Sequence, residues 1–324
     1  MSVDVYQIGS TENGALDLAC QRALPYLAAA RAAGTRDVYR RAWQRWAKWC
    51  ATMHAAPLQA TPQTVAAYLA ELAREGKSVA SIKGALAAIV HVHRAEGDGT
   101  LGQQPAITSV MAGITRRSSR PIKRAAALKL DDLRTILADI DGHDLRALRD
   151  RALLLIGFFA ALRRSELVAL DVRCRAVGGQ GSGRSSVDIQ PEGLLVYLSG
   201  TKASAMTQTV AIPRRDDALC ATRALETYMA AAGISYGALF RPVSKSGRLL
   251  ARRLEATGVR HILAQRAAGE GFSPHSLRAG FITSAAEAAV PEHVIQRTSR
   301  HKSIEALRCY IRAGDPFNCA ARHF

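Results

Sequence analysis

The chain has 324 residues and an apolar fraction of 48%, which suits about two domains that each bury a core. Lysine and arginine outnumber aspartate and glutamate by 44 to 27, and the resulting net charge of +17 favours a polyanionic partner over a merely basic protein without one. The sequence has no signal stretch and no run as long as a membrane span, so we expect a soluble cytoplasmic protein with no membrane partner. The six cysteines form no C-x-x-C pair, which argues against a zinc site and a disulfide framework.

A helical domain is predicted over residues 16–117, after a disordered start at residues 1–15. Helices are expected at residues 36–53, 62–75, 79–96 and 105–116, of which the first has the clearest pattern and the last the weakest. Thr61 and Pro62 are a typical helix start, because threonine caps an N-terminus and proline suits the first helical position. His91 and His93 are two residues apart and do not share a helical face, so we interpret them as residues without a metal.

The helix at residues 36–53 has two opposed faces. The apolar face, which we expect in the core, carries Tyr39, Trp43, Trp46, Cys50 and Met53. The opposite face carries Gln44, no acid and four cations: Arg40, Arg41, Arg45 and Lys48. A charged row is often only solvated, but a purely cationic one also suits the phosphate contacts that position a protein on DNA, and both interpretations stay open. Lys83, on a later helix, is a further candidate for such contacts.

A basic linker is predicted over residues 118–126, before a second domain over residues 127–324. This region combines a proline and two serines with no apolar periodicity, which is typical of a connecting segment. The cationic run that could follow a phosphate backbone between the domains begins at the end of the helical domain and continues into the linker: Arg116, Arg117, Arg120, Lys123 and Arg124.

The second domain is predicted to place helices around a small antiparallel sheet. Helices are expected at residues 131–140, 144–161, 216–231, 247–268, 274–288 and 303–312. Strands are expected at residues 186–189, 194–198 and 207–212, with a turn at 200–204. The glycine-rich stretch at residues 178–185 lacks the Gly-Lys-Ser/Thr of a phosphate-binding loop, so we interpret it as a surface insertion.

Four short motifs in this domain carry groups suited to phosphate chemistry. The first is Ala-Leu-Arg-Arg-Ser-Glu-Leu at residues 161–167, and the second is Lys202 in the turn between the second and third strands. The third is His275 with Arg278 at the start of a predicted helix, which Ser273 would cap and Pro274 would begin. The two side chains share one face at that N-terminus, which suits an anion.

The fourth motif is His301 followed nine residues later by Tyr310, on a helix that Ser303 would cap. The spacing of Ile304, Leu307 and Ile311 gives this helix an apolar side by which to dock. Taken alone, a tyrosine at such a position is an ordinary packing residue. The three upstream motifs change that interpretation, because together they supply cations and proton carriers for a reacting hydroxyl.

In this order and at these separations, the motifs resemble those of the tyrosine recombinases, also called phage-integrase-type recombinases, over about residues 35–315. The N-terminal half is most similar to the Cre-like members. The resemblance implies a mainly α fold, with a helical SAM-like core-binding domain and an α+β catalytic domain that clamp DNA. It implies a site-specific recombinase that acts as a homotetramer on two double-stranded DNA sites through a Holliday junction, without metal or cofactor.

The resemblance also assigns roles at the phosphate. Tyr310 would attack a phosphodiester and form a 3′-phosphotyrosyl link, which conserves the bond energy for rejoining. Arg163 and Arg278 would hold the non-bridging oxygens, since the planar guanidinium fork matches phosphate. Arg164 competes with Arg163 for this role, but the family pattern places the arginine directly after Leu162.

Four further residues receive supporting roles from the resemblance. His275 and His301 would donate hydrogen bonds, and one of them would accept the proton of the tyrosine. Lys202 would protonate the departing 5′ oxygen. Glu166 would brace the arginines or His275.

The chain departs from the family pattern around this site. Ala160 and Ala161 replace a Thr-Gly pair, and Arg300 replaces the glycine before His301, which adds bulk near the tyrosine. Only a short segment, residues 315–324, follows for docking on a neighbouring protomer.

Two other functions are compatible with parts of the pattern. A type IB topoisomerase would relax DNA as a monomer with related chemistry, but the Cre-like helical domain argues against it. A catalytically silent DNA-binding protein is the other alternative, and the complete set of motif residues argues against that.

The cationic helix face yields a first prediction. Arg41→Ala or Arg45→Ala should weaken binding to DNA of any sequence and lower the slope of log affinity against log salt by about one unit each. Fluorescence anisotropy with a labelled duplex at several salt concentrations measures that slope. An unchanged slope would assign the face to solvent.

Overall fold

A computed structural model describes residues 14–31, 33–118, 126–172, 185–199, 207–267 and 271–311. The chain divides into two compact units, Met1–Ile122 and Lys123–Phe324. Several sequence predictions lie outside the described residues: the start of the chain up to residue 13, linker residues 119–125 with Arg120 and Lys123, the insertion at 178–184, the turn at 200–204 with Lys202, and the segment 315–324.

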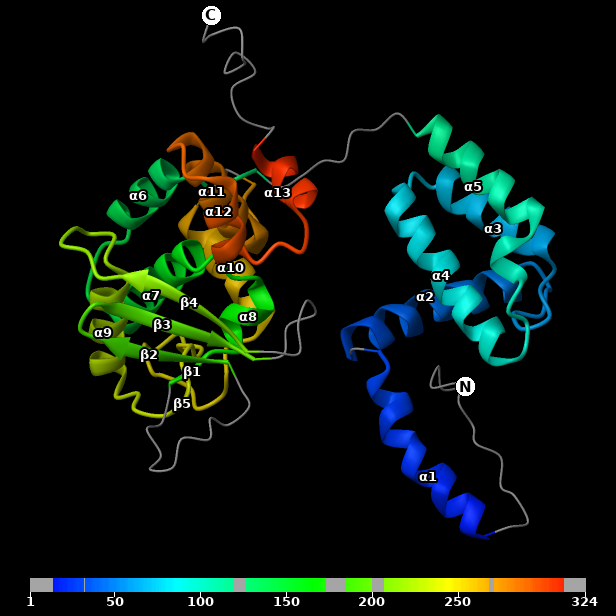
Figure 1. Cartoon of the computed structure of the whole chain (residues 1–324), viewed down its shortest axis with the longest axis horizontal. Helices are drawn as coiled ribbons and strands as arrows, with labels where there is room; N and C mark the ends of the chain where they lie inside the picture. The colour runs from blue at the N-terminus through cyan, green and yellow to red at the C-terminus, as the bar shows by residue number, and fades with distance from the viewer. Residues whose placement is uncertain are drawn as a thin grey trace, which may run out of the picture. The chain divides into compact units, whose positions relative to one another are not determined.

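The first unit is helical (Figure 1). Its elements are α1 (Gly14–Ala29), α2 (Ala33–Thr52), α3 (Pro62–Arg74), α4 (Val79–Ala95), the short 3-10 helix η1 (Leu101–Gln103) and α5 (Pro105–Arg117). The predicted start of α3 is confirmed, because the Thr61 hydroxyl accepts a hydrogen bond from the Thr64 N–H at 3.2 Å and Pro62 is the first helical residue.

The core of this unit forms around the apolar face of α2. Trp43, Trp46 and Cys50 are buried there, and the Trp46 indole donates to the Pro57 carbonyl at 3.1 Å. The prediction for Met53 is wrong: this side chain is 56% exposed, because α2 ends at Thr52 and the residue lies in the following turn.

The predicted cationic face of α2 is exposed at each of its members. It is not free of acid, however, because Asp37 accepts a hydrogen bond from Arg40 at 2.6 Å and thereby pairs with it. Lys83 on α4 and both arginines at the end of α5, Arg116 and Arg117, are also exposed. These side chains are therefore accessible for the proposed phosphate contacts.

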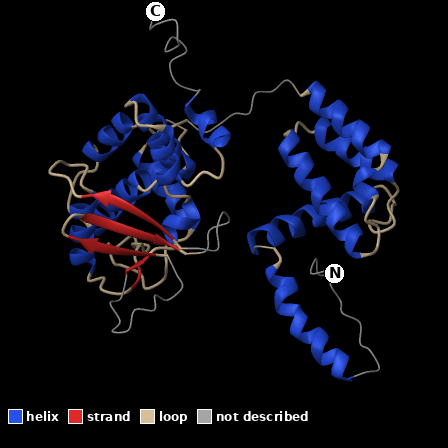
Figure 2. Ribbon diagram, viewed as in Figure 1, coloured by secondary structure: helices blue, strands red, loops and turns tan. Residues whose placement is uncertain are grey.

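The second unit surrounds a sheet with helices (Figure 2). Its helices are α6 (Leu130–Ala138), α7 (Leu145–Phe159), α8 (Arg164–Val168), α9 (Ala221–Ala232), α10 (Ala256–Arg266), α11 (Pro274–Glu287), α12 (Glu292–Ser299) and α13 (Ile304–Ile311). Helix α7 is buried along nearly its whole length, and it packs against α9 and α11. It therefore forms the centre of the unit.

The sheet is mixed rather than antiparallel. Its order is β4 (Gln208–Pro213), β3 (Gly193–Leu198), β2 (Ser186–Gln190), β1 (Asp171–Val172) and β5 (Gly237–Ala238). The predicted hairpins are present, with the buried valines Val187, Val196 and Val210 in register across three strands. The additional strand β1 runs parallel to β2, and two-residue strands such as β1 and β5 are too short to leave a periodic pattern in the sequence.

Two predicted helices begin later than expected, and two helices were missed. At the start of α9, the Asp217 carboxylate accepts the Leu219 N–H at 3.1 Å and holds a turn in place of a helix. Before α10, the Leu250 N–H donates to the Pro242 carbonyl at 2.9 Å. The backbone near Leu250 therefore pairs with an earlier segment and does not begin the helix. The missed helices are α8 and α12.

The chain enters the second unit by crossing α11. The Leu128 N–H donates to the Ser276 carbonyl at 3.0 Å, and the Leu130 N–H donates to the Ser284 hydroxyl at 2.9 Å. A Cβ placed on Gly280 would lie 1.5 Å from the Leu128 carbonyl oxygen. Only glycine allows the two backbones to approach so closely, and this contact fixes α11.

Gly280→Ala should therefore lower the free energy of unfolding of the second unit by about 2 kcal/mol or more, because backbone must move to admit the methyl group. Urea unfolding followed by far-ultraviolet circular dichroism measures this loss. All three tryptophans lie in α2, so the tryptophan fluorescence transition reports the first unit and should not move.

A matched control for this substitution is Gly113→Ala. Gly113 lies inside α5, where an added Cβ would meet nothing within 4 Å. This change should stabilise the first unit by roughly 0.5–1 kcal/mol through helix propensity. An unchanged circular dichroism midpoint in Gly280→Ala would contradict the close-approach argument.

Candidate active site

The turn between α7 and α8 positions the first arginine. Helix α7 ends at Phe159, and Ala161 then adopts a left-handed conformation with φ 47°, a position that glycine adopts more readily. Arg163 follows as the residue that caps α8. Its Nη1 donates to Glu166 at 2.6 Å, and its backbone N–H donates to the other carboxylate oxygen at 2.8 Å.

The neighbouring Arg164 is exposed on the first turn of α8. Arg163 instead points toward Glu166 and bonds to it. Burial is the main cause that lowers the pKa of His275 and of His301, and the charge of Arg163 lowers both further. The geometry therefore places Arg163 in the cluster, as the sequence interpretation favoured.

The N-terminus of α11 positions the second arginine. The predicted cap is present, with the Ser273 hydroxyl accepting the His275 N–H at 3.3 Å. One turn on, Arg278 is only 1% exposed, and its Nη1 donates to the Ala161 carbonyl at 2.9 Å. Its Nη2 is buried and has no partner among the described residues. A buried guanidinium N–H of this kind is suited to an anionic oxygen.

Helix α13 brings the tyrosine to this cluster. Leu307 is fully buried against Ile282 of α11 and Ile295 of α12, which docks the helix as its apolar spacing predicted. Arg308 adds an ion pair to Glu292 at 3.0 Å. The predicted cap is also present, because Ser303 accepts the Ala306 N–H at 3.3 Å.

The Tyr310 hydroxyl lies 2.7 Å from His275 Nε2. The ring of His301 is 5.5 Å from the tyrosine ring between centroids, and its Nδ1 lies 2.9 Å from the Ser299 hydroxyl. The tyrosine is thus flanked by both histidines.

Burial and positive charge hold the histidines neutral. Burial lowers the pKa of His301 to about 4, with further lowering from the guanidinium groups of Arg278 and Arg163. Burial and the same two arginines also lower the pKa of His275. Both side chains are therefore free to accept a proton at neutral pH.

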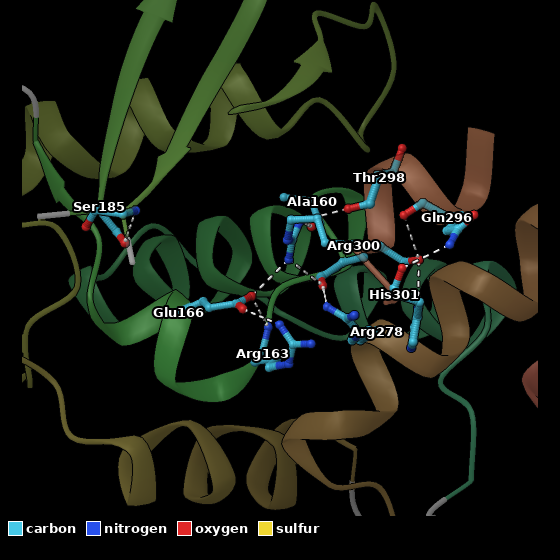
Figure 3. Close-up of polar contacts among 12 residues, drawn as sticks. Ala160, Arg163, Glu166, Ser185, Arg278, Gln296, Thr298, Arg300 and His301 are labelled. Carbon is cyan, nitrogen blue, oxygen red and sulfur yellow. Dashed lines mark hydrogen bonds and ion pairs between the residues drawn. The ribbon is translucent and has the colours of Figure 1, made fainter. Parts of the chain in front are cut away.

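Glu166 joins two arginines. Burial alone would raise the pKa of this carboxyl, but the Arg300 guanidinium and the hydrogen bonds from Arg163 more than offset it, so its pKa is lowered. Figure 3 shows the carboxylate between the two guanidinium groups. No hydrogen bond to His275 is present at this carboxylate, so Glu166 braces the arginines.

Sequence reasoning described Arg300 only as added bulk. The structure places its side chain in the interior, 4% exposed and paired with Glu166 at 2.9 Å. Burial lowers the pKa of Arg300, and its attraction to Glu166 partly offsets this. The feature of the sequence that could have indicated this role is the arginine in place of the usual glycine before His301.

The described residues contain no group of three or more histidine, cysteine, aspartate or glutamate side chains that could hold a metal ion. None of the described helices is both long enough and apolar enough to cross a membrane.

Residues 126–315 match the phage integrase family, and residues 23–96 match the phage integrase N-terminal SAM-like domain. Because the first match covers more than half of the chain, the chain belongs to the phage integrase family and is an enzyme of the tyrosine recombinase class.

Individual relatives agree with this family. An integrase/recombinase XerD homologue of Selenomonas ruminantium is 29% identical over 299 residues, which cover 89% of this chain and 84% of the relative. A tyrosine recombinase XerC 1 of Ralstonia nicotianae is 28% identical over 209 residues, or 63% of this chain and 61% of the relative. The solved structure of the XerH site-specific recombinase bound to a palindromic difH substrate is similar in fold, with a TM-score of 0.62 at 14% identity, covering 100% of this chain and 92% of that one.

The lowered pKa of His301 predicts that acid destabilises the fold. A histidine in the unfolded chain titrates near 6.5, whereas here the pKa is about 4. Between these values the unfolded state binds the extra proton, so the free energy of unfolding falls as the pH falls. His301→Gln should reduce the loss between about pH 7.5 and pH 5 by on the order of 1 kcal/mol, after allowance for solvent screening.

Urea midpoints at the two pH values measure this difference. His143→Gln, at an exposed histidine outside the site, should keep the pH dependence of the wild-type protein. An equal acid loss in His301→Gln and the wild-type protein would contradict the assignment.

Proposed function

We propose that the protein is a site-specific DNA recombinase that cleaves and rejoins strands through a 3′-phosphotyrosyl intermediate. The observation that carries the proposal is the hydroxyl of Tyr310, 2.7 Å from His275 and beside the buried Arg278, whose Nη2 has no partner among the described residues. A nucleophile, a neutral base and an unsatisfied cation together suit attack on a phosphodiester.

In the proposed reaction, the Tyr310 oxygen attacks the phosphorus and passes its proton to Nε2 of His275. The bond from phosphorus to the 5′ oxygen breaks, and the tyrosine remains linked to the 3′ phosphate. Arg163 and Arg278 hold the non-bridging oxygens, where negative charge increases in the transition state. His301 donates a further hydrogen bond to the phosphate.

The departing 5′ oxygen needs a proton. By the family resemblance, Lys202 supplies it, and this residue lies in the stretch outside the described residues. The reverse sequence of steps rejoins the strand, so no external energy source enters the proposed cycle.

DNA is the proposed partner, and the exposed cations of the first unit would contact its phosphates. The sequence of this unit resembles that of Cre recombinase, which supports action at specific sites over relaxation of arbitrary DNA. The full proposal is a homotetramer that holds two sites and exchanges strands in pairs through a Holliday junction.

The covalent step can be tested before the target site is known. A pool of duplexes, randomised in sequence and each carrying a nick a few nucleotides 3′ of the potential scissile phosphate, releases a short 5′-hydroxyl fragment upon cleavage and traps the adduct. Wild-type protein should give a denaturant-resistant protein–DNA band, and Tyr310→Phe should give none because the nucleophilic oxygen is gone. Tyr236→Phe removes an exposed hydroxyl from the same unit and should leave the band unchanged.

Sequencing the trapped DNA then separates the alternatives. One enriched sequence, and junction products when two copies of it are supplied, are the expected results. Adducts without sequence preference, with relaxation of supercoiled DNA by a monomer, would instead indicate a topoisomerase. Absence of any wild-type adduct would leave a catalytically silent DNA-binding protein.

A further inference from the structure

Arg300 has a backbone conformation that arginine rarely adopts. It follows the last residue of α12 with φ 57° and ψ 42°, and its N–H donates to the Gln296 carbonyl at 2.7 Å. Glycine takes this left-handed position at a helix end without steric cost, whereas a residue with a Cβ loses free energy there. An arginine at this point therefore needs a compensating interaction from its side chain.

The guanidinium makes four hydrogen bonds (Figure 3). Nη1 donates to the carbonyls of Ala160 at 2.9 Å and Thr298 at 2.7 Å. Nη2 donates to the carbonyl of Ala161 at 3.1 Å and to Glu166 at 2.9 Å. Ala160 and Ala161 directly follow α7, where carbonyls lack the partners that a continuing helix would supply. Arg300 satisfies the Ala160 carbonyl and shares the Ala161 carbonyl with Arg278.

The acceptors that hold Arg300 also hold the two arginines of the site. Glu166 accepts Arg163, and the Ala161 carbonyl accepts Arg278 at 2.9 Å. Arg300 is bonded to both of these acceptors and thereby connects them. It also immediately precedes His301, whose carbonyl oxygen accepts the side-chain amide of Gln296 at 3.1 Å.

We propose that Arg300 is a positioning residue, which fixes the separation of Arg163 and Arg278 and the placement of His301 without touching DNA. Both of its terminal nitrogens are engaged by protein acceptors, which leaves the buried Nε as its one nitrogen without a partner among the described residues. The guanidinium fork is therefore directed at protein, whereas Arg278 keeps a terminal N–H for the phosphate. This inference rests on the proposed function, because the separation matters only if the two arginines share one phosphate.

Two substitutions at this position separate positioning from charge. Arg300→Gly suits the left-handed backbone and removes the guanidinium, whereas Arg300→Lys keeps the charge and loses the planar fork. Ala289→Gly is the matched control, since Ala289 has the same φ of 57° in an exposed turn between α11 and α12. It relaxes a left-handed residue outside the site.

The probe is the nicked duplex that the wild-type protein enriches from the randomised pool. The single-turnover rate of adduct formation at saturating protein should fall about 100-fold in Arg300→Gly, because a small misplacement of catalytic groups has this effect. The dissociation constant for the duplex should stay within about threefold, since the guanidinium does not face DNA. Arg300→Lys should give an intermediate rate, and Ala289→Gly should react as the wild type does.

Glu166→Gln, alone and combined with Arg300→Gly, tests the connection directly. If Arg300 acts through Glu166, the rate loss in the double variant should be clearly smaller than the product of the two single losses. Multiplicative losses, a wild-type rate in Arg300→Gly, or a loss confined to DNA affinity would each overturn the inference.

If Arg300→Gly fails to fold, Arg300→Lys decides, and a wild-type rate in that variant would equally overturn the positioning role. Absence of an adduct with the wild-type protein would overturn the proposed function and this inference with it. A wild-type adduct together with an unaffected Arg300→Gly would overturn the inference alone.

Discussion

The balance of charge around Glu166 is the constraint on which the site depends. Three guanidinium groups, those of Arg163, Arg278 and Arg300, converge where α7 ends. Burial, followed by repulsion from the other two guanidinium groups, lowers the pKa of Arg278 to about 10. Removing one partner of a buried charged cluster is costly, because the remaining charges are left without compensation. Glu166 is the carboxylate that pairs with two of these arginines, so it determines how closely they approach.

Among the described residues of the site, three cations against one carboxylate leave an excess of two positive charges, with both histidines neutral. A phosphodiester carries one negative charge, and its transition state under attack by a tyrosine oxygen approaches two. In the proposed reaction, the site therefore complements the transition state better than the ground state. The fixed carbonyls that orient Arg278 and Arg300 mean that this preference exists before DNA binds.

Local signals in the sequence predicted much of the fold. The helices α3 and α11 were found from a hydroxyl cap followed by proline, and α13 from the apolar spacing that buries Leu307. The two-residue strands β1 and β5 were not found, because their pairing is set by tertiary contacts such as the hydrogen bond from Arg253 to the Leu170 carbonyl. The apolar pattern of α2 continues to Met53 in the sequence, although the helix itself ends at Thr52.

The motifs predicted which residues of the site come together, but not what links them. Spacing within a helix places His275 beside Arg278, and it could not reveal that Ala161 supplies one carbonyl to two arginines. The burial of Arg300 depends on a left-handed residue at the end of α12, a helix that left no clear pattern in the sequence. Contacts of this kind join turns that are distant along the chain, so local patterns do not record them.

The crossing of the entering chain over α11 has a mechanical consequence. Tension in the segment before residue 126 would first load the hydrogen bond from Leu128 to Ser276, since it precedes the contact of Leu130 along the chain. Ser276 lies between His275 and Arg278 on the same helical turn. The chain entering the second unit and the end of α11 that is proposed to bind phosphate are therefore mechanically in series, and a pull on this chain acts on that end before it acts on the rest of the second unit.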